Sequence, residues 1–212
     1  MPSPSNPKPK TKILDITRSK EYEERLFRCL APMPFRKYRR RAQYLETAVP
    51  KGFRKKIMFL DGDAIGQIEY VPAEASGLPI SGNGIIVMNC IWVLRRAKGH
   101  NLGRTLLADS IHRERNATGF ATIALENHPS PWMKKDQIER LGFASIDSVE
   151  LRHRVKHKET SFKVHLMWLP LKERAQKPAW NIESLLEGVT FCMAHPLYNP
   201  ESLGIRRIFE KR

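Results

Sequence analysis

Apolar and polar positions alternate along this chain in two different periods. Between residues 19 and 48 the apolar side chains lie three or four residues apart, as at Tyr22, Leu26 and Leu30, which is the spacing of a helix face. From residue 56 onwards, short apolar runs are separated by turn residues such as Asp61 and Gly62, a pattern typical of strands. The pattern predicts helices over residues 19–30, 38–48, 103–117, 132–141 and 182–187, and strands over 12–17, 56–60, 64–71, 85–93, 120–125, 146–151, 162–169 and 189–193.

The run 85–93, IIVMNCIWV, is the most apolar of these strands, which predicts a position at the centre of a sheet, buried on both faces. A helix with Leu106, Leu107 and Ile111 on one face follows it, and then another strand, which is the order of a βαβ unit. The chain therefore predicts an α/β or α+β sheet covered by helices. We expect a main domain over residues 12–170, a disordered basic leader over 1–11 and an appendage over 171–212.

Positive charge is the main departure from average composition. The 212 residues include 37 Lys and Arg against 22 Asp and Glu, a net charge of +15 at pH 7. The excess is concentrated in residues 35–56 and 152–163, and such clusters attract anionic partners: nucleic acid, cofactor phosphates or acidic protein surfaces. A solvated basic surface is the alternative interpretation.

No apolar run approaches the roughly 20 residues of a membrane-spanning helix. The basic residues 8–12 are not followed by the apolar segment of a signal peptide, so we expect a cytoplasmic protein with no membrane partner. Cys29, Cys90 and Cys192 are scattered and lack CxxC spacing, which disfavours a disulfide framework and a zinc site. We expect no metal, and buried packing is the simplest interpretation of the three thiols.

The strongest chemical signal is the segment that follows the central strand. Residues 95–105 form a basic loop with Gly99 and Gly103 directly before a predicted helix. The first N–H groups of a helix have no partner within it and lie at the positive end of its dipole, so this loop suits a phosphorylated ligand. A Walker A loop would need one more residue between the glycines and Lys in place of Arg104, and a dinucleotide fingerprint would need Gly in place of Asn101.

A third interpretation fits the surroundings of this loop. The hexapeptide RAKGHN, residues 96–101, resembles the [RQ]xxGx[GA] loop of GNAT-type N-acetyltransferases, with Asn101 in place of the last Gly or Ala. Asn tolerates a positive φ better than most side chains, and Gly103 offers a second flexible position. The segments IEY, CIWV and PWM, together with the LGF turn at residues 141–143, extend the resemblance over residues 13–170.

The resemblance implies a mixed, mostly antiparallel central sheet flanked by helices, and acetyl-CoA as the cofactor. Backbone groups of Ile91, Trp92 and Val93 would align the pantetheine arm, and a bulge in this strand would free an N–H group for the thioester oxygen. The loop and the first helical turn would hold the pyrophosphate. The cofactor-binding residues expected there are Arg96, Lys98, Gly99, His100, Asn101, Leu102, Gly103 and Arg104.

Acyl transfer to an amine requires removal of a proton from the nitrogen. Many GNAT enzymes place a Glu on the central strand, but residues 85–93 contain none, so the predicted base is Glu69 on the preceding strand. The usual Tyr acid is also missing from residues 132–142, so the leaving thiolate either departs unprotonated or takes a proton from another group. For that group we predict Cys90, with His100 and His128 as alternatives. Each of these side chains also has a purely structural interpretation.

The sequence thus predicts an N-acyltransferase that transfers an acetyl group from acetyl-CoA directly to an amine of a small molecule or a protein. In a GNAT-like layout the basic helix 35–48 and the basic cluster 152–163 would lie beside the acceptor opening, which favours an anionic acceptor or an acidic protein surface. Two alternatives are a basic module that binds phosphates or nucleic acid without catalysis, and a degenerate GNAT protein that only binds CoA. Nucleic acid is the less favoured partner, because the sequence has no helix-turn-helix or RNP-like motif.

Overall fold

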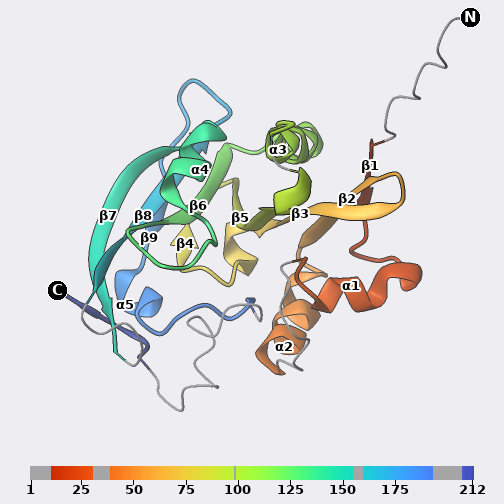
Figure 1. Ribbon diagram of the computed structural model, residues 1–212. Helices are drawn as coiled ribbons and strands as arrows, with labels where there is room; N and C mark the ends of the chain where they lie inside the picture. The colour runs from red at the N-terminus through yellow and green to blue at the C-terminus, as the bar shows by residue number, and fades with distance from the viewer. Residues whose placement is uncertain (1–10, 31–38, 98, 155–159, 193–206) are drawn as a thin grey trace, which may run out of the picture.

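Eight strands form one continuous sheet at the centre of the computed structural model, which describes residues 11–30, 39–97, 99–154, 160–192 and 207–212 (Figure 1). The spatial order is β1-β2-β3-β5-β6-β8-β7-β10. Their bounds are β1 Thr11–Asp15, β2 Arg54–Leu60, β3 Asp63–Pro72, β5 Ile85–Val93, β6 Gly119–Glu126, β7 Ala144–His153, β8 Ser161–Pro170 and β10 Phe209–Lys211. Only β5 and β6 run parallel, and every other neighbouring pair is antiparallel. The predicted fold class is confirmed.

Helices cover both faces of this sheet. They are α1 Glu23–Phe27, α2 Arg39–Ala48, α3 Leu102–Arg113, α4 Lys135–Arg140 and α5 Ile182–Leu185. Figure 1 shows α3 on one side of β3 and β5, with α1 and α2 on the opposite side. Leu106 of α3 packs on Gly66 of β3, where a Cβ atom would come within 3.0 Å of the Leu106 Cδ1 atom, so this glycine lets the helix approach the sheet closely. Among the described helices, none has the length and apolar character needed to cross a bilayer.

The predicted elements match the structure best where the apolar pattern is strongest. The central strand has the predicted bounds, Ile85–Val93, and residues 85–90 are buried. The first predicted helix is shorter than expected: a 3-10 turn, Lys20–Tyr22, precedes the short helix α1. No strand forms over residues 189–192, and Met193 lies outside the described residues. Val189 and Phe191 are instead buried in the core without sheet pairing.

The central strand carries a bulge. Glu69 pairs with Cys90 and Tyr70 pairs with Met88, so Asn89 is an extra residue in β5. The amide of Asn89 is buried and donates to the Tyr44 hydroxyl at 2.8 Å, which holds the bulge against α2. A bulge bends its strand away from the regular ladder. The bulge that the resemblance implied is therefore present.

The sheet splits next to this bulge. The parallel pairing of β5 with β6 covers only residues 85–87 of β5 and 119–121 of β6, although both strands continue beyond it. The Thr122 hydroxyl donates to the Met88 carbonyl at 2.6 Å, so a side chain replaces the backbone partner at the point where the strands diverge. The backbone edge of β5 after Met88 is thus released from β6.

The C-terminal segment, predicted as an appendage over 171–212, packs on the main domain wherever it is described. Strand β10 extends the sheet beside β7, and β9 (Ala179–Trp180) pairs with β4 (Ile80–Ser81). Leu185 and Phe191 belong to the same hydrophobic core as the central strand. The basic leader, residues 1–10 in particular, lies outside the described residues.

Candidate active site

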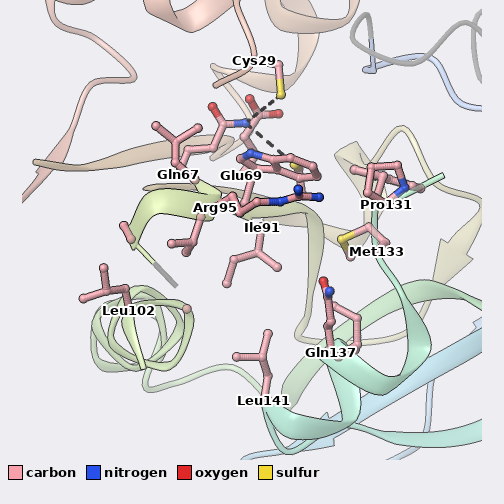
Figure 2. A pocket seen from close by; sticks show the side chains of 18 of the residues that line it. Cys29, Gln67, Glu69, Ile91, Arg95, Leu102, Pro131, Met133, Gln137 and Leu141 are labelled. Carbon is pink, nitrogen blue, oxygen red and sulfur yellow. Dashed lines mark hydrogen bonds between the residues drawn. The ribbon is translucent and has the colours of Figure 1, made fainter. Parts of the chain in front are cut away.

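A cavity of about 1000 Å³ opens where β5 and β6 separate. Figure 2 shows Ile91 of β5 near its middle, Leu102 of α3 and Leu141 after α4 towards one end, and Cys29 and Gln67 at the other. The cavity therefore extends from the start of α3 to the sheet face that α2 covers. It has room for a long ligand at one end and a second molecule at the other.

The start of α3 lines this cavity, and the first N–H groups of a helix have no partner within it. Asn101 is the residue before the helix and has φ of 54°, and Gly99 has φ of 91°, so both adopt the left-handed conformation. Asn101 itself adopts the positive φ, as predicted. Gly103 lies inside the helix without a positive φ, so the loop does not use it as a second flexible position. Gly99, Asn101, Leu102 and Gly103 all line the cavity. Helix starts of this kind bind anionic groups such as phosphates.

The arrangement of the chain is similar to that of known proteins. No protein-family model matches the chain, and no curated protein matches its sequence. A protein described as a GNAT-family acetyltransferase from Desulfovibrio desulfuricans matches with a TM-score of 0.54 at 15% identity, covering 77% of this chain and 100% of that one. The fold is that of the GNAT acetyltransferases.

Two further GNAT-fold structures agree. The ribosomal-protein-S18-alanine N-acetyltransferase from Escherichia coli has a TM-score of 0.52 at 12% identity, covering 79% of this chain and 100% of that one. Ard1 from Thermoplasma volcanium has a TM-score of 0.50 at 14% identity, covering 77% and 99%. The TM-scores establish the shared fold, and at these identities most of the aligned residues differ between the proteins.

The structure brings most of the predicted cofactor residues to the cavity. Two do not line it: His100, and Arg104, whose Nε donates to the Arg140 carbonyl at 3.0 Å at the end of α4. Arg96 lines the cavity and forms an exposed ion pair with Asp63 at 3.0 Å. Lys98 lies outside the described residues. The predicted residues that line the cavity are Ile91, Trp92, Val93, Arg96, Gly99, Asn101, Leu102 and Gly103.

Glu69 lines the cavity, but it lies in a buried ion cluster. Its two carboxylate oxygens accept from the Arg41 guanidinium at 2.8 and 3.0 Å, and the Lys55 ammonium lies 2.9 Å away. Burial alone would raise the pKa of Glu69, but the two cations outweigh it and lower the pKa to about 2. A carboxylate held in this way is a poor proton acceptor near neutral pH. The geometry therefore argues against the predicted role of Glu69 as general base.

Cys90 is equally unsuited to its predicted role. A hydrogen bond with Cys29, followed by burial, raises the pKa of the Cys90 thiol well above its ordinary value. Such a thiol is a weaker acid than the free thiol of CoA, so it does not readily give a proton to the leaving thiolate. The alternative residue His128 accepts from the Ser130 N–H at 3.1 Å and packs on Phe162, outside the cavity.

Several residues that line the cavity are absent from the site predicted from the sequence. Arg41, counted in the basic cluster 35–56, is only 3% exposed. It lines the cavity together with Glu69, its ion-pair partner. Gln67 lies two residues before Glu69 in β3, so the two-residue period of a strand places it on the same face and could have identified it. Phe191 and Cys192 reach the cavity from the C-terminal segment, and nothing in their local sequence indicates this.

Proposed function

We propose that the protein is an acetyl-CoA-dependent N-acetyltransferase that transfers the acetyl group directly to an amine. The observation that carries this proposal is the cavity through the split between β5 and β6. It joins a helix start suited to phosphates on one face of the sheet to an enclosed space beside β3 and α2 on the other. Two ligands that entered from these two ends would meet beside Cys90 and Ile91, directly after the bulge in β5.

The described residues fit acetyl-CoA. The N–H groups from Gly99 to Gly103 would hold the pyrophosphate, and the released edge of β5 at Ile91–Val93 would pair with the amides of the pantetheine arm. The cofactor supplies an acyl group activated as a thioester. Arg95 and Arg96 line the same part of the cavity and would add favourable charge for the phosphates.

Glu69 would act in this enzyme by organising the acceptor end of the cavity. Its partner Arg41 also donates to the Phe191 carbonyl at 2.9 Å and to the Leu26 carbonyl at 2.8 Å, and Lys55 donates to the Arg28 carbonyl. One ion cluster thereby joins β2, β3, α2, the end of α1 and the C-terminal segment. The cluster would hold the walls of the acceptor end in place.

Apart from its amine, the acceptor molecule would be neutral or negatively charged. The cavity lining includes five Arg side chains and one carboxylate, Glu69, which two cations already neutralise. Three of the five, Arg28, Arg96 and Arg140, pair with the exposed carboxylates Glu24, Asp63 and Asp136, and such exposed pairs are weak, so the lining remains basic. The residual positive charge would attract an anionic molecule or an acidic protein surface. Replacing Arg28 by Gln is expected to lower kcat/KM for an anionic acceptor, less so at high salt. An equal effect at low and high salt would contradict this attraction.

Calorimetric titration with acetyl-CoA, ATP and a short nucleic acid tests the proposal. Gly99 and Gly62 form a matched pair for this test, because they have φ of 91° and 90° and neither would bring a Cβ within 4 Å of another atom. Only Gly99 lines the cavity. Gly99→Val and Gly62→Val are therefore expected to lower stability alike, whereas Gly99→Val alone weakens acetyl-CoA binding by roughly tenfold or more, about 1.4 kcal/mol.

The outcomes separate the proposal from its alternatives. Acetyl-CoA binding that Gly99→Val weakens, followed by release of CoA with an amine panel, supports the acetyltransferase. Binding without turnover of any amine indicates a degenerate GNAT protein. If acetyl-CoA does not bind while nucleic acid binds in a salt-dependent manner, the protein is a binding module.

A further inference from the structure

Three buried N–H groups at the acceptor end of the cavity have no oxygen acceptor among the described residues. They are Nε2 of Gln67, Nε1 of Trp92 and Nε of Arg41. All three residues line the cavity. A buried donor left without an acceptor costs about 1–3 kcal/mol, so two donors without any partner, beside a Gln67 amide that reaches only thiol sulfur atoms, require an explanation.

The amide of Gln67 is held in a fixed orientation. Its Oε1 accepts from the Leu30 N–H at 3.2 Å, which directs the Nε2 atom away from the backbone of that segment. The partners of Nε2 are the sulfur atoms of Cys29 at 3.6 Å and of Cys90 at 3.8 Å, shown as dashed lines in Figure 2. Thiol sulfur is a weak acceptor, and the side chain is only 1% exposed. The two amide hydrogens are therefore available to a better acceptor inside the cavity.

Trp92 lies on the same face of the sheet as Gln67. The two residues are opposite one another in the antiparallel ladder between β3 and β5, so their side chains extend from the same side. The Nε1 atom of Trp92 is buried and has no hydrogen-bond partner in the described structure. A second donor thus lies beside the Gln67 amide.

The charged group nearby does not satisfy these donors. Both oxygens of Glu69 already accept from Arg41, and Lys55 adds a third contact. The Arg41 Nη atoms are used by Glu69, Phe191 and Leu26, which leaves its Nε without a partner among the described residues. This end of the cavity is rich in donors and poor in acceptors. A ligand oxygen with free lone pairs complements it.

We propose that the acceptor amine carries a carbonyl or carboxylate oxygen close to its nitrogen, and that the Gln67 Nε2 group binds this oxygen. This inference rests on the proposed acetyltransferase function and specifies its substrate class: α-amino carbonyl compounds in preference to simple alkylamines. Gln67 is then a specificity-determining residue that touches the acceptor. Trp92 Nε1 is the second donor available to the same oxygen.

The test uses the full-length protein with acetyl-CoA and compares two acceptors, phenylalaninamide and phenethylamine. They differ by one carboxamide group. Wild type is expected to show a higher kcat/KM for phenylalaninamide, mainly through a lower KM. Because the two amines differ in basicity, the decisive quantity is how a substitution changes their ratio. Gln67→Met removes the donor at similar volume, and it is expected to lower the ratio roughly tenfold by raising KM for phenylalaninamide alone.

Control variants exclude indirect effects. Gln43→Met removes an exposed amide from α2, outside the cavity lining, and should leave the ratio unchanged. Gln67→Glu keeps an oxygen for the Leu30 N–H and removes the donor, so it should reproduce the loss even if Gln67→Met unfolds the segment around Leu30. Melting temperature and acetyl-CoA affinity are measured for each variant.

The possible results are distinct. A ratio that neither Gln67 variant changes would overturn the inference while leaving the acetyltransferase proposal intact. An equal loss of kcat for both amines would also overturn it, because the amide would then act on the acyl group. Absence of turnover by wild type with every amine would contradict the proposed function itself, and the inference with it.

Discussion

The guanidinium group of Arg41 binds both carboxylate oxygens of Glu69, at 2.8 and 3.0 Å, in the interior of the protein. The two side chains are 4% and 5% exposed, and Lys55 completes the cluster from β2. Charges removed from water in this way are costly unless each is paired. The pairing explains how Arg41 of α2 and Lys55 of β2, two cations of a strongly basic segment, are buried between the helix and the sheet instead of facing solvent.

Removing the carboxylate should destabilise the protein strongly. Glu69→Gln leaves Arg41 and Lys55 buried without a counter-charge, so we expect a loss of about 3–5 kcal/mol in the free energy of unfolding. Urea denaturation measures this loss. The matched control is Asp63→Asn, which breaks the exposed pair with Arg96 and should cost at most about 1 kcal/mol. Equal stability of Glu69→Gln and wild type would show that the cluster contributes nothing.

Acid should remove the same contribution. The pKa of Glu69 is about 2 in the folded protein, below the ordinary value of 4.5 that applies when the chain is unfolded. The stabilisation is therefore complete above pH 4.5 and declines as the pH falls towards 2, because the unfolded state takes up the proton first. We expect the stability difference between wild type and Glu69→Gln to shrink from pH 6 to pH 3. A constant difference across this range would contradict the lowered pKa.

The conformation of Asn101 leads to a prediction for the loop. Its φ of 54° is unfavourable for β-branched residues, so Asn101→Val should cost about 1–2 kcal/mol and weaken acetyl-CoA binding by misplacing the N–H groups before α3. Asn101→Gly should retain the affinity, because Gly adopts this conformation without strain. Thermal unfolding and calorimetry of both variants measure the two effects. Equal affinities for the Val and Gly variants would mean that the loop conformation does not control binding.

The Cys90 thiol should react slowly. Its pKa lies well above the ordinary range because of the Cys29 contact and burial, so little thiolate is present at pH 8. We expect iodoacetamide to label Cys90 much more slowly than it labels glutathione. Mass spectrometry of the tryptic peptides measures the labelling rate. Bound acetyl-CoA should slow the labelling further, because Cys90 lines the cavity. Labelling of Cys90 at the rate of free glutathione would contradict the raised pKa.

Local sequence features predicted the part of the site that lies on consecutive residues. The apolar run Ile85–Val93 identified the central strand because a strand buried on both faces needs apolar side chains at every position. The loop before α3 was recognisable because helix starts and glycine spacing follow rules that act over a few residues. Asn101 in the left-handed conformation follows from the same local energetics.

The acceptor end of the cavity depends on contacts that no local pattern encodes. Arg41 joins Glu69, 28 residues away, and the Phe191 carbonyl, 150 residues away, so the same basic segment that suggested a charged surface contributes a buried cation. The structure argues against the predicted base and acid for this reason: the pKa of Glu69 and of Cys90 depends on neighbours brought by α2, by β2 and by the segment around Cys29. The sequence by itself determined the strands of the sheet and the loop before α3, since these rest on periodicity and short-range geometry. The GNAT-type fold came from the resemblance of residues 13–170 to that family. Only the tertiary structure decided which side chains are charged, buried or free to bind a substrate, because hydrogen bonding, burial and Coulomb interactions act between residues that are distant along the chain.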